Sequence, residues 1–233
     1  MMSTNHKLIL FDIDGTIVIY RDRMPEKIFE DMVMHFFSRE VSLAEYRFSG
    51  KTDKAIIHDT LTMAGISDAE REANELAIME WVADELDHRS HPDLFLLLPN
   101  VTVLLDELAS RSDTTLALLT GNLPRCAETK LAQFDLNRYF AFGAFGVESV
   151  NRNDLGPVAL QRFAHHHGFD VSGEDTVIIG DAIPDVLCAK HIGAKSLITL
   201  TGRTTRDELE PYSPDFIFND LSDTEVVLNA IYQ

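Results

Sequence analysis

The first strong signal along the chain is a short run of apolar residues near its beginning. Leu8 to Phe11 is apolar without interruption, which is typical of a strand buried on both faces of a parallel sheet rather than of a half-exposed strand. We therefore predict a strand over about residues 7–13. Similar short runs predict later strands over residues 114–119, 140–145, 176–179, 196–200 and 216–218.

Apolar residues at helical spacing fill the intervals between these strands. The pattern predicts helices at about 25–37, 53–64, 67–87, 101–111, from 123 onward, 157–168, 184–191 and 221–231. Alternating strands and helices favour an α/β fold with a mostly parallel sheet covered on both faces. Residues 24–89 contain no strong strand, so residues 21–95 are predicted to be an inserted helical subdomain, and residues 1–20 and 96–233 the core.

Composition narrows the class of protein. The 233 residues are 45% hydrophobic, enough for a real core, and 20 basic against 38 acidic residues give a formal charge of −18. Bulk charge therefore disfavours binding to nucleic acid or to an anionic membrane surface. Cys126 and Cys188 are too few for a disulfide framework, which favours a reducing cytoplasm. We expect neither a signal peptide nor a membrane span. The pattern does not indicate whether the protein is a monomer or an oligomer.

Two carboxylates stand where the first strand ends. Asp12 and Asp14 follow the apolar run, and Gly15 can bend the chain there. In extended geometry residues two apart point to the same side, and the carboxyl ends of parallel strands are where open α/β sheets bind ligands. A solvated acidic turn is the alternative, and the ends of the later strands decide between the two.

Two later strand ends carry matching polar groups. Thr120, Gly121 and Asn122 lead from one strand into a helix start that can offer backbone N–H groups to a phosphate, although Thr120 could simply be a turn residue. Asp181 and Asp185 follow another strand, and Asp185 could instead favour the start of the next helix. Carboxylates that gather from separate strands repel one another unless a cation intervenes, and oxygen ligands of this kind suit Mg²⁺.

These motifs, in this order, resemble the haloacid dehalogenase (HAD) superfamily. The matching segments are Asp12 to Thr16, Thr120 to Asn122 and Gly180 to Asp185, and the resemblance covers essentially the whole chain. It implies a Rossmann-like three-layer core with a mobile helical cap in the C1 position. The pattern is most similar to phosphoglycolate phosphatase-like and β-phosphoglucomutase-like members.

The resemblance also implies a role for each residue. Asp12 would be the nucleophile that forms an aspartyl-phosphate, and Asp14 the general acid and base. Mg²⁺ would be held by the Asp12 carboxylate, the Asp14 carbonyl and Asp181, with Asp185 as ligand or support. Thr120, with Gly121 and Asn122, would bind the phosphoryl group.

The family's third motif is a single Lys or Arg between the second and fourth motifs. Arg152, before the helix at 157–168, is the best match. Lys130 is the competitor, but it lies well inside the helix that follows Thr120, and we expect it to point away from the site.

We interpret the sequence as that of a Mg²⁺-dependent phosphatase that acts on a small phosphorylated metabolite. A phosphomutase would use the same core, and a non-catalytic phosphate-binding protein on the same fold is a more distant alternative. Dehalogenation is disfavoured because it needs no acid at the position of Asp14. Phosphoryl transfer mainly needs positioning and neutralisation of anionic oxygens, and the motifs supply both.

Substrate choice is expected to come from the helical insertion. Residues 49–53 form a loop between helical segments, in which Gly50 gives freedom and Lys51 places a cation. The resemblance puts a specificity loop in this region. We expect Lys51 to contact the leaving group when the cap closes, although it could also be an ordinary solvated residue before a helix.

Overall fold

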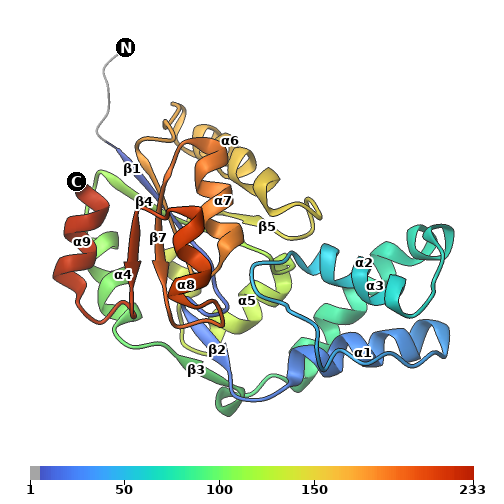
Figure 1. The fold of residues 1–233 in the computed structure, drawn as a ribbon. Helices are drawn as coiled ribbons and strands as arrows, with labels where there is room; N and C mark the ends of the chain where they lie inside the picture. The colour runs from blue at the N-terminus through green and yellow to red at the C-terminus, as the bar shows by residue number, and fades with distance from the viewer. Residues whose placement is uncertain (1–5) are drawn as a thin grey trace.

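A six-stranded parallel sheet forms the centre of the molecule (Figure 1), whose computed structural model describes residues 6–233. The strand order is β5-β4-β1-β6-β7-β8, so β1 lies inside the sheet between β4 and β6. The strands are β1 (Lys7–Phe11), β4 (Thr114–Thr120), β5 (Gly143–Phe145), β6 (Thr176–Gly180), β7 (Lys195–Thr199) and β8 (Phe216–Phe218).

Helices cover both faces of this sheet. Leu8 and Leu10 of β1 pack on the side of α6 (Leu155–His167) and α7 (Ile183–Ile192), whereas Ile9 and Phe11 pack on the other side. The second side is covered by α4 (Val101–Ala109), α5 (Pro124–Ala132) and α9 (Thr224–Tyr232). Because both faces are buried, the four positions from Leu8 to Phe11 are all apolar, which explains the unbroken run in the sequence. The predicted α/β fold with a three-layer core is confirmed.

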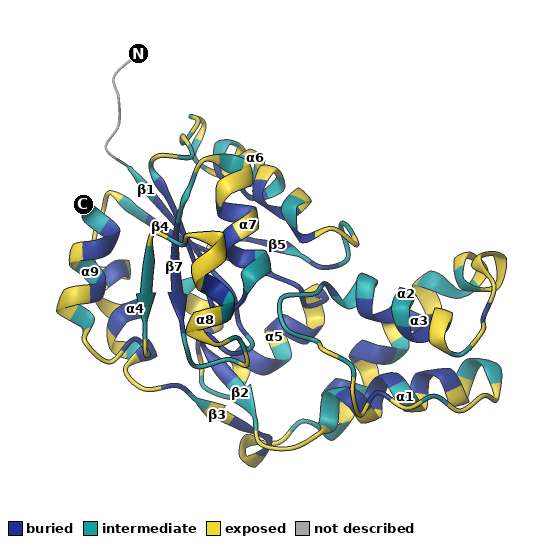
Figure 2. Ribbon diagram, in the orientation of Figure 1, coloured by how far each residue is buried: buried dark blue, intermediate teal, exposed yellow. Residues whose placement is uncertain are grey.

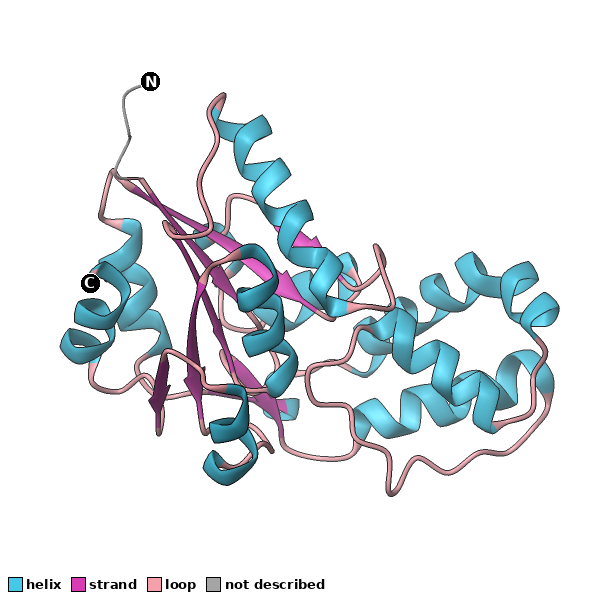
Figure 3. Ribbon diagram, turned by 45° about the horizontal axis from the view of Figure 1, so that its top comes forward, coloured by secondary structure: helices cyan, strands magenta, loops and turns pink. Residues whose placement is uncertain are grey.

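A helical insert stands beside the sheet, on the right in Figure 1 and again in Figure 3. Its helices are α1 (Met24–Phe37), α2 (Asp53–Met63) and α3 (Asp68–Arg89). Figure 2 shows buried residues on the inner sides of these helices, and their apolar side chains continue into the main core. A short helix, α8 (Arg206–Leu209), packs through Leu209 near β7.

The insert is joined to the core by two chain crossings that pair with each other. β2 (Val18–Tyr20) and β3 (Phe95–Leu97) form an antiparallel two-stranded ribbon. The sequence analysis did not predict this ribbon, because each strand has only three residues and its partner lies on the far side of the insertion. Pairing across such a distance leaves no local pattern.

Side-chain caps begin two helices of the insert. The Thr52 side chain accepts a hydrogen bond from the Ala55 N–H and begins α2, and Ser67 forms a capping box with Glu70 at the start of α3. Gly65 follows α2 with a φ of +71°, as a helix end in the left-handed region requires. Among residues 6–233, no helix is both long and apolar enough to cross a membrane.

Candidate active site

Three buried aspartates meet at the carboxyl ends of two neighbouring strands. Asp12 follows β1, and Asp181 follows β6, which pairs directly with β1. Asp185 lies in the first turn of α7. One carboxylate oxygen from each of the three lies within 4.8 Å of the others, and all three residues are buried. The sheet therefore concentrates negative charge at one point.

Burial makes this concentration costly for the ionised carboxylates. It raises the pKa of Asp12 to about 6, with the negative charges of Asp185 and Asp14 adding to the rise and Arg152 opposing it. The pKa of Asp181 is raised well above its usual value, first by burial and then by the charges of Asp185 and Asp12. Among the described residues, Asp181 Oδ1 has no hydrogen-bond partner. Such an orphaned oxygen beside other carboxylates fits a hard divalent cation.

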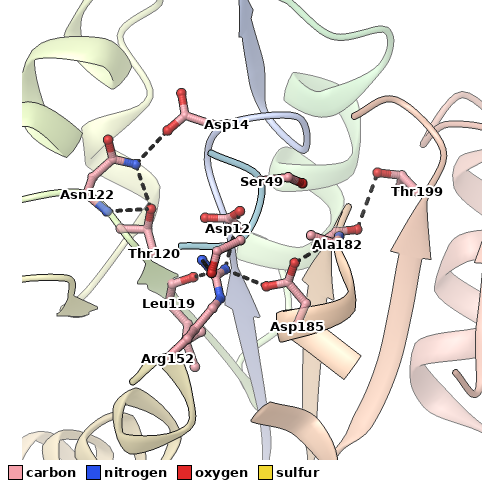
Figure 4. Close-up of polar contacts among 12 residues, drawn as sticks. Asp12, Asp14, Ser49, Leu119, Thr120, Asn122, Arg152, Ala182, Asp185 and Thr199 are labelled. Atoms are coloured by element: carbon pink, nitrogen blue, oxygen red, sulfur yellow. Dashed lines mark hydrogen bonds and ion pairs between the residues drawn. The ribbon is translucent and has the colours of Figure 1, made fainter. Parts of the chain in front are cut away.

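Asp185 differs from Asp181 in that both of its oxygens are engaged. Its Oδ2 accepts a hydrogen bond of 3.1 Å from the Ala182 N–H at the start of α7, and its Oδ1 accepts one from Arg152 (Figure 4). Asp185 therefore caps α7 with one oxygen and binds the buried guanidinium of Arg152 with the other. A direct bond to a metal would have to compete with these partners.

Arg152 lies in a short 3₁₀ turn before α6 and is only 5% exposed. Its Nη2 lies 3.3 Å from Asp12 Oδ2 and donates to Asp185 and to the Leu119 carbonyl. Burial by itself lowers the pKa of this guanidinium, but the charges of Asp12 and Asp185 outweigh that effect and raise it. Arg152 is therefore a permanent positive charge next to Asp12.

Two glycines make room for Asp181. Gly15, which follows Asp14, has a φ of +85°, and a Cβ there would lie 2.6 Å from the Asp181 Cγ. A Cβ on Gly202, in the loop after β7, would lie 1.7 Å from Asp181 Oδ2. The sequence analysis did not single out Gly202, because only the fold brings its loop to the aspartates.

Asp14 points toward Asn122, as Figure 4 shows, and is held by two donors. Lys130 Nζ lies 2.6 Å from Asp14 Oδ2, and Asn122 Nδ2 lies 2.7 Å from the same oxygen. Lys130 also donates to Asn122 Oδ1 at 2.5 Å. These three side chains form one closed polar network.

The expectation that Lys130 points away from the site is wrong. The expectation rested on its place well inside the helix that follows Thr120, but α5 packs against the core and the long side chain reaches back toward Asp14. Only 4% of Lys130 is exposed. Burial lowers the pKa of its ammonium, but the charge of Asp14, with help from Asp53, reverses that effect and raises it.

Thr120 and Gly121 shape the turn after β4. The Thr120 hydroxyl accepts hydrogen bonds from the Asn122 backbone N–H, at 3.3 Å, and from its side-chain amide, at 2.7 Å. A Cβ on Gly121 would lie 2.0 Å from the Lys51 carbonyl oxygen. Gly121 is therefore required because a loop of the helical insert lies directly against this turn.

That loop, residues 49–53, is attached to the core at several points. The Asp53 carboxylate accepts a 2.7 Å hydrogen bond from the Leu123 N–H at the start of α5, and Gly50 packs against Pro184. The Lys51 ammonium instead stays within the insert, where it donates to Asp59 at 2.7 Å and to Tyr46 at 2.9 Å. A leaving group that contacts Lys51 would have to share it with these partners.

A cavity of about 330 Å³ lies between the aspartates and the insert. Asp12, Asp14 and Asp181 line its core side, and residues of α1, α2 and α3 line the opposite side. The volume suits a small organic ligand. The predicted residues Asn122, Gly121 and Arg152 also border this space, as do Gly50 and Lys51.

The sequence is similar to those of known proteins. A family model described as "HAD-hyrolase-like" matches residues 154–224. The chain is 27% identical over 226 residues to a phosphoglycolate phosphatase of Vibrio cholerae, covering 95% of this chain and 97% of that protein. It is 22% identical over 224 residues to the pyrophosphatase PpaX of Bacillus mycoides, covering 96% and 97% of the two chains.

The fold is also found in solved structures. A solved haloacid dehalogenase-like hydrolase from Streptococcus pneumoniae superimposes with a TM-score of 0.60 at 19% identity, covering 97% of this chain and 98% of the other. Similar sequences therefore extend over nearly the whole length, and the buried aspartate cluster lies at the sheet edge where the motifs predicted it. The chain is therefore similar, in sequence and in fold, to haloacid dehalogenase-like phosphatases.

Proposed function

We propose that this phosphatase hydrolyses a small phosphomonoester with the help of Mg²⁺, through an aspartyl-phosphate formed on Asp12. The observation that carries the proposal is the buried group of Asp12, Asp181 and Asp185, with Arg152 Nη2 3.3 Å from Asp12. A purely structural role would leave unexplained why carboxylates are buried together with an oxygen that lacks a partner.

The metal would be held by Asp12 and Asp181, with the Asp14 carbonyl as a third ligand by analogy with the family. When bound, Mg²⁺ neutralises charge on the carboxylates and the phosphoryl oxygens and polarises the phosphorus. Asp185 would stabilise this arrangement indirectly, because it holds Arg152 and the start of α7 in position. Thr120, Gly121 and Asn122 offer hydrogen-bonding groups on the other side of Asp12.

In the first displacement, an Asp12 oxygen attacks the phosphorus and the bond from phosphorus to the leaving oxygen breaks. Arg152 offsets the repulsion between the carboxylate and the phosphate dianion. Asp14 gives its proton to the leaving oxygen, so that a neutral alcohol departs. The phosphoryl group is then carried on Asp12 as an acyl phosphate.

In the second displacement, water attacks the phosphorus and the bond to Asp12 breaks. Asp14, now ionised, takes the proton from that water and is ready to act again as an acid. Lys130 and Asn122 hold the ionised Asp14 in place, so Lys130 acts as a positioning residue for the base. Inorganic phosphate is released and free Asp12 is restored.

Residues 21–95 serve in this proposal as a cap that covers the site and excludes water. The contacts of Asp53 with Leu123 and of Gly50 with Pro184 are those of a closed cap. Lys51 would tune substrate choice from the same loop. Relatives named for phosphoglycolate and for pyrophosphate support a small phosphorylated metabolite as substrate, and two buried free cysteines suit a reducing cytoplasm.

The test is phosphate release from p-nitrophenyl phosphate by the purified protein, with Mg²⁺ and with excess chelator. Release should require Mg²⁺ and should disappear in Asp12→Asn. Full activity in chelator, or activity in Asp12→Asn equal to that of the wild type, would refute the proposal. Interconversion of sugar phosphates with little net release of phosphate would instead favour a phosphomutase.

A further inference from the structure

The cavity has two chemically different ends. Its core end carries the aspartates, whereas its insert end is mostly apolar. The apolar wall comes from α1, from the loop that leads to α2, and from α2 and α3 themselves, with the residues Ile28, Phe29, Phe48, Ile56, Val82 and Leu86. A leaving group that extends from the phosphoryl site would lie against this wall.

Three carboxylates interrupt the apolar wall, and two of them, Asp22 and Asp53, accept hydrogen bonds from the backbone N–H groups of Met24 and Leu123. Glu26, in the first turn of α1, lines the cavity and is only 6% exposed. No described residue donates a hydrogen bond to its carboxylate, and the two cations that pair with it, Arg23 at 3.7 Å and Arg203 at 3.9 Å, lie beyond hydrogen-bond distance. The side chains of Arg23 and Arg203 are 55% and 76% exposed, so solvent screens both pairs.

A position in the first helical turn alone does not explain Glu26. The helix dipole favours an acid there, but that interaction is available to a solvated side chain. Burying a carboxylate without a hydrogen-bond donor is unfavourable unless a partner arrives. Glu26 is therefore placed to receive a donor from a bound molecule.

Apart from Arg203, which is 76% exposed and lies 3.9 Å from Glu26, the cations that line the cavity are engaged by other groups. Lys51 donates to Asp59, and Lys130 donates to Asp14. Arg152 pairs with Asp12 and Asp185 at the phosphoryl end. An anionic leaving group would thus meet Glu26 without a free buried cation to balance it, in a chain whose net charge is −18.

We propose that the preferred substrate is a phosphomonoester whose leaving alcohol has an apolar body and an ammonium group that pairs with Glu26. The site discriminates against leaving groups that carry a carboxylate or a second phosphate. This inference rests on the proposed phosphatase function and specifies its substrate class. It also separates this chain from the relatives named for phosphoglycolate and pyrophosphate.

The test compares three aryl phosphates that share one ring and differ in charge at the far end. They are 4-(aminomethyl)phenyl, 4-(hydroxymethyl)phenyl and 4-(carboxymethyl)phenyl phosphate. The wild type should prefer the ammonium compound over the carboxylate compound by about tenfold or more in kcat/KM, since an ion pair replaces a like-charge contact in a partly buried site. Equal values, or a preference for the carboxylate, would overturn the inference.

Two variants with the same loss of charge locate the effect. Glu26→Gln should reduce the ratio of kcat/KM between the ammonium and hydroxymethyl compounds by several-fold, as expected when one charged partner is removed. Glu45→Gln, an exposed acid in the same insert, should keep the wild-type ratio. If both variants change the ratio equally, general charge rather than Glu26 is responsible and the inference fails.

A binding measurement tests the charge preference independently of the proposed phosphatase activity. Calorimetry with the three corresponding benzylphosphonates, in the presence of Mg²⁺, needs no turnover. Tighter binding of the aminomethyl compound without hydrolysis of any aryl phosphate would refute the phosphatase mechanism but support the charge preference. Hydrolysis of all three with equal affinity for the phosphonates would leave the mechanism intact and refute the preference.

Discussion

The core wall and the insert wall of the cavity are built on opposite principles. The core wall brings together ionisable groups that form ion pairs with one another. Asp12 and Asp185 pair with Arg152, and Asp14 pairs with Lys130. The insert wall is mostly apolar, and among its carboxylates Glu26 accepts no hydrogen bond from the described residues. On the core wall only the Asp181 oxygen still lacks a partner and calls for a cation, while on the insert wall the Glu26 carboxylate lacks a hydrogen-bond donor.

This contrast indicates how the two tasks are divided. Groups that handle a phosphoryl group must be fixed before the substrate binds, because their alignment lowers the barrier. Groups that choose the alcohol need to recognise only what is bound. Variants on the core wall should therefore change the rate or metal binding, and variants on the insert wall should change selectivity.

The largest effect is expected from removing the carboxylate with the free oxygen. Asp181→Asn should lower kcat/KM by roughly a hundredfold or more at Mg²⁺ levels that saturate the wild type, since a metal ligand loses its charge. The measurement is activity against Mg²⁺ concentration. Asp170→Asn, which removes the charge of an exposed acid after α6, is the control. An unchanged Mg²⁺ dependence in Asp181→Asn would show that Asp181 is not a ligand.

The second effect concerns the buried lysine. Lys130→Met should lower kcat by about tenfold to a hundredfold with an alkyl phosphate, because Asp14 loses the cation that positions it. The loss should be smaller with p-nitrophenyl phosphate, whose leaving group needs little protonation. Lys27→Met, an exposed lysine of the insert, is the matched control. Wild-type kinetics with both substrates would exclude a role for Lys130.

The third effect is on stability rather than on rate. Asp185→Asn should destabilise the metal-free protein by roughly 3 kcal/mol, because it breaks a buried ion pair and cannot satisfy both Arg152 and the Ala182 N–H. Urea unfolding of both proteins measures the difference. A loss of less than about 0.5 kcal/mol would mean that Arg152 is held well enough by Asp12 alone.

A smaller effect tests the contact between insert and core. Burial raises the pKa of Asp53 to about 6 in the folded protein, above its ordinary 3.8. A raised folded pKa contributes stability below the unfolded pKa, and this contribution is lost as the pH rises through about 6. Asp53→Asn keeps an acceptor for the Leu123 N–H without the charge.

Asp53→Asn should therefore be more stable than the wild type at pH 7.5, by about 1–2 kcal/mol, and the gap should narrow toward pH 4. Unfolding curves at the two pH values measure this difference. A variant that is less stable at both pH values would show that the charge, not just the acceptor, holds Asp53 to α5.

Lys51 is expected to give the smallest effect. Its ammonium is already bound to Asp59 and Tyr46, so Lys51→Ala should change kcat/KM by only a few-fold, and more for a substrate with a bulky leaving group than for p-nitrophenyl phosphate. Equal changes for both substrates would remove Lys51 from substrate selection. Its specificity role stays a prediction until then.

Sequence reasoning performed best where the signal is local. The strand before Asp12 could be predicted because a strand buried on both faces must be apolar at every position. Caps such as Thr52 and Ser67 lie within three residues of the groups they bind. The convergence of Asp12 and Asp181 followed from the parallel order of the strands, without any knowledge of side-chain positions.

The features that the sequence did not reveal depend on contacts between distant segments. The pairing of β2 with β3 joins the two ends of the insert. Lys130 was misplaced because helical periodicity fixes the direction of a side chain but not how α5 packs against Asp14. Glu26 looked like an ordinary first-turn acid until α1 was placed over the cavity. A local pattern carries no information on any of these three.

The central claim is that Asp12 carries the phosphoryl group during turnover. Rapid acid quenching of the enzyme during hydrolysis of p-nitrophenyl phosphate, followed by peptide mass spectrometry, tests it directly. The account predicts a phosphorylated peptide with the modification on Asp12, formed only with Mg²⁺, and no such peptide from Asp12→Asn. A phosphoryl group on another residue, or full turnover by Asp12→Asn, would contradict it.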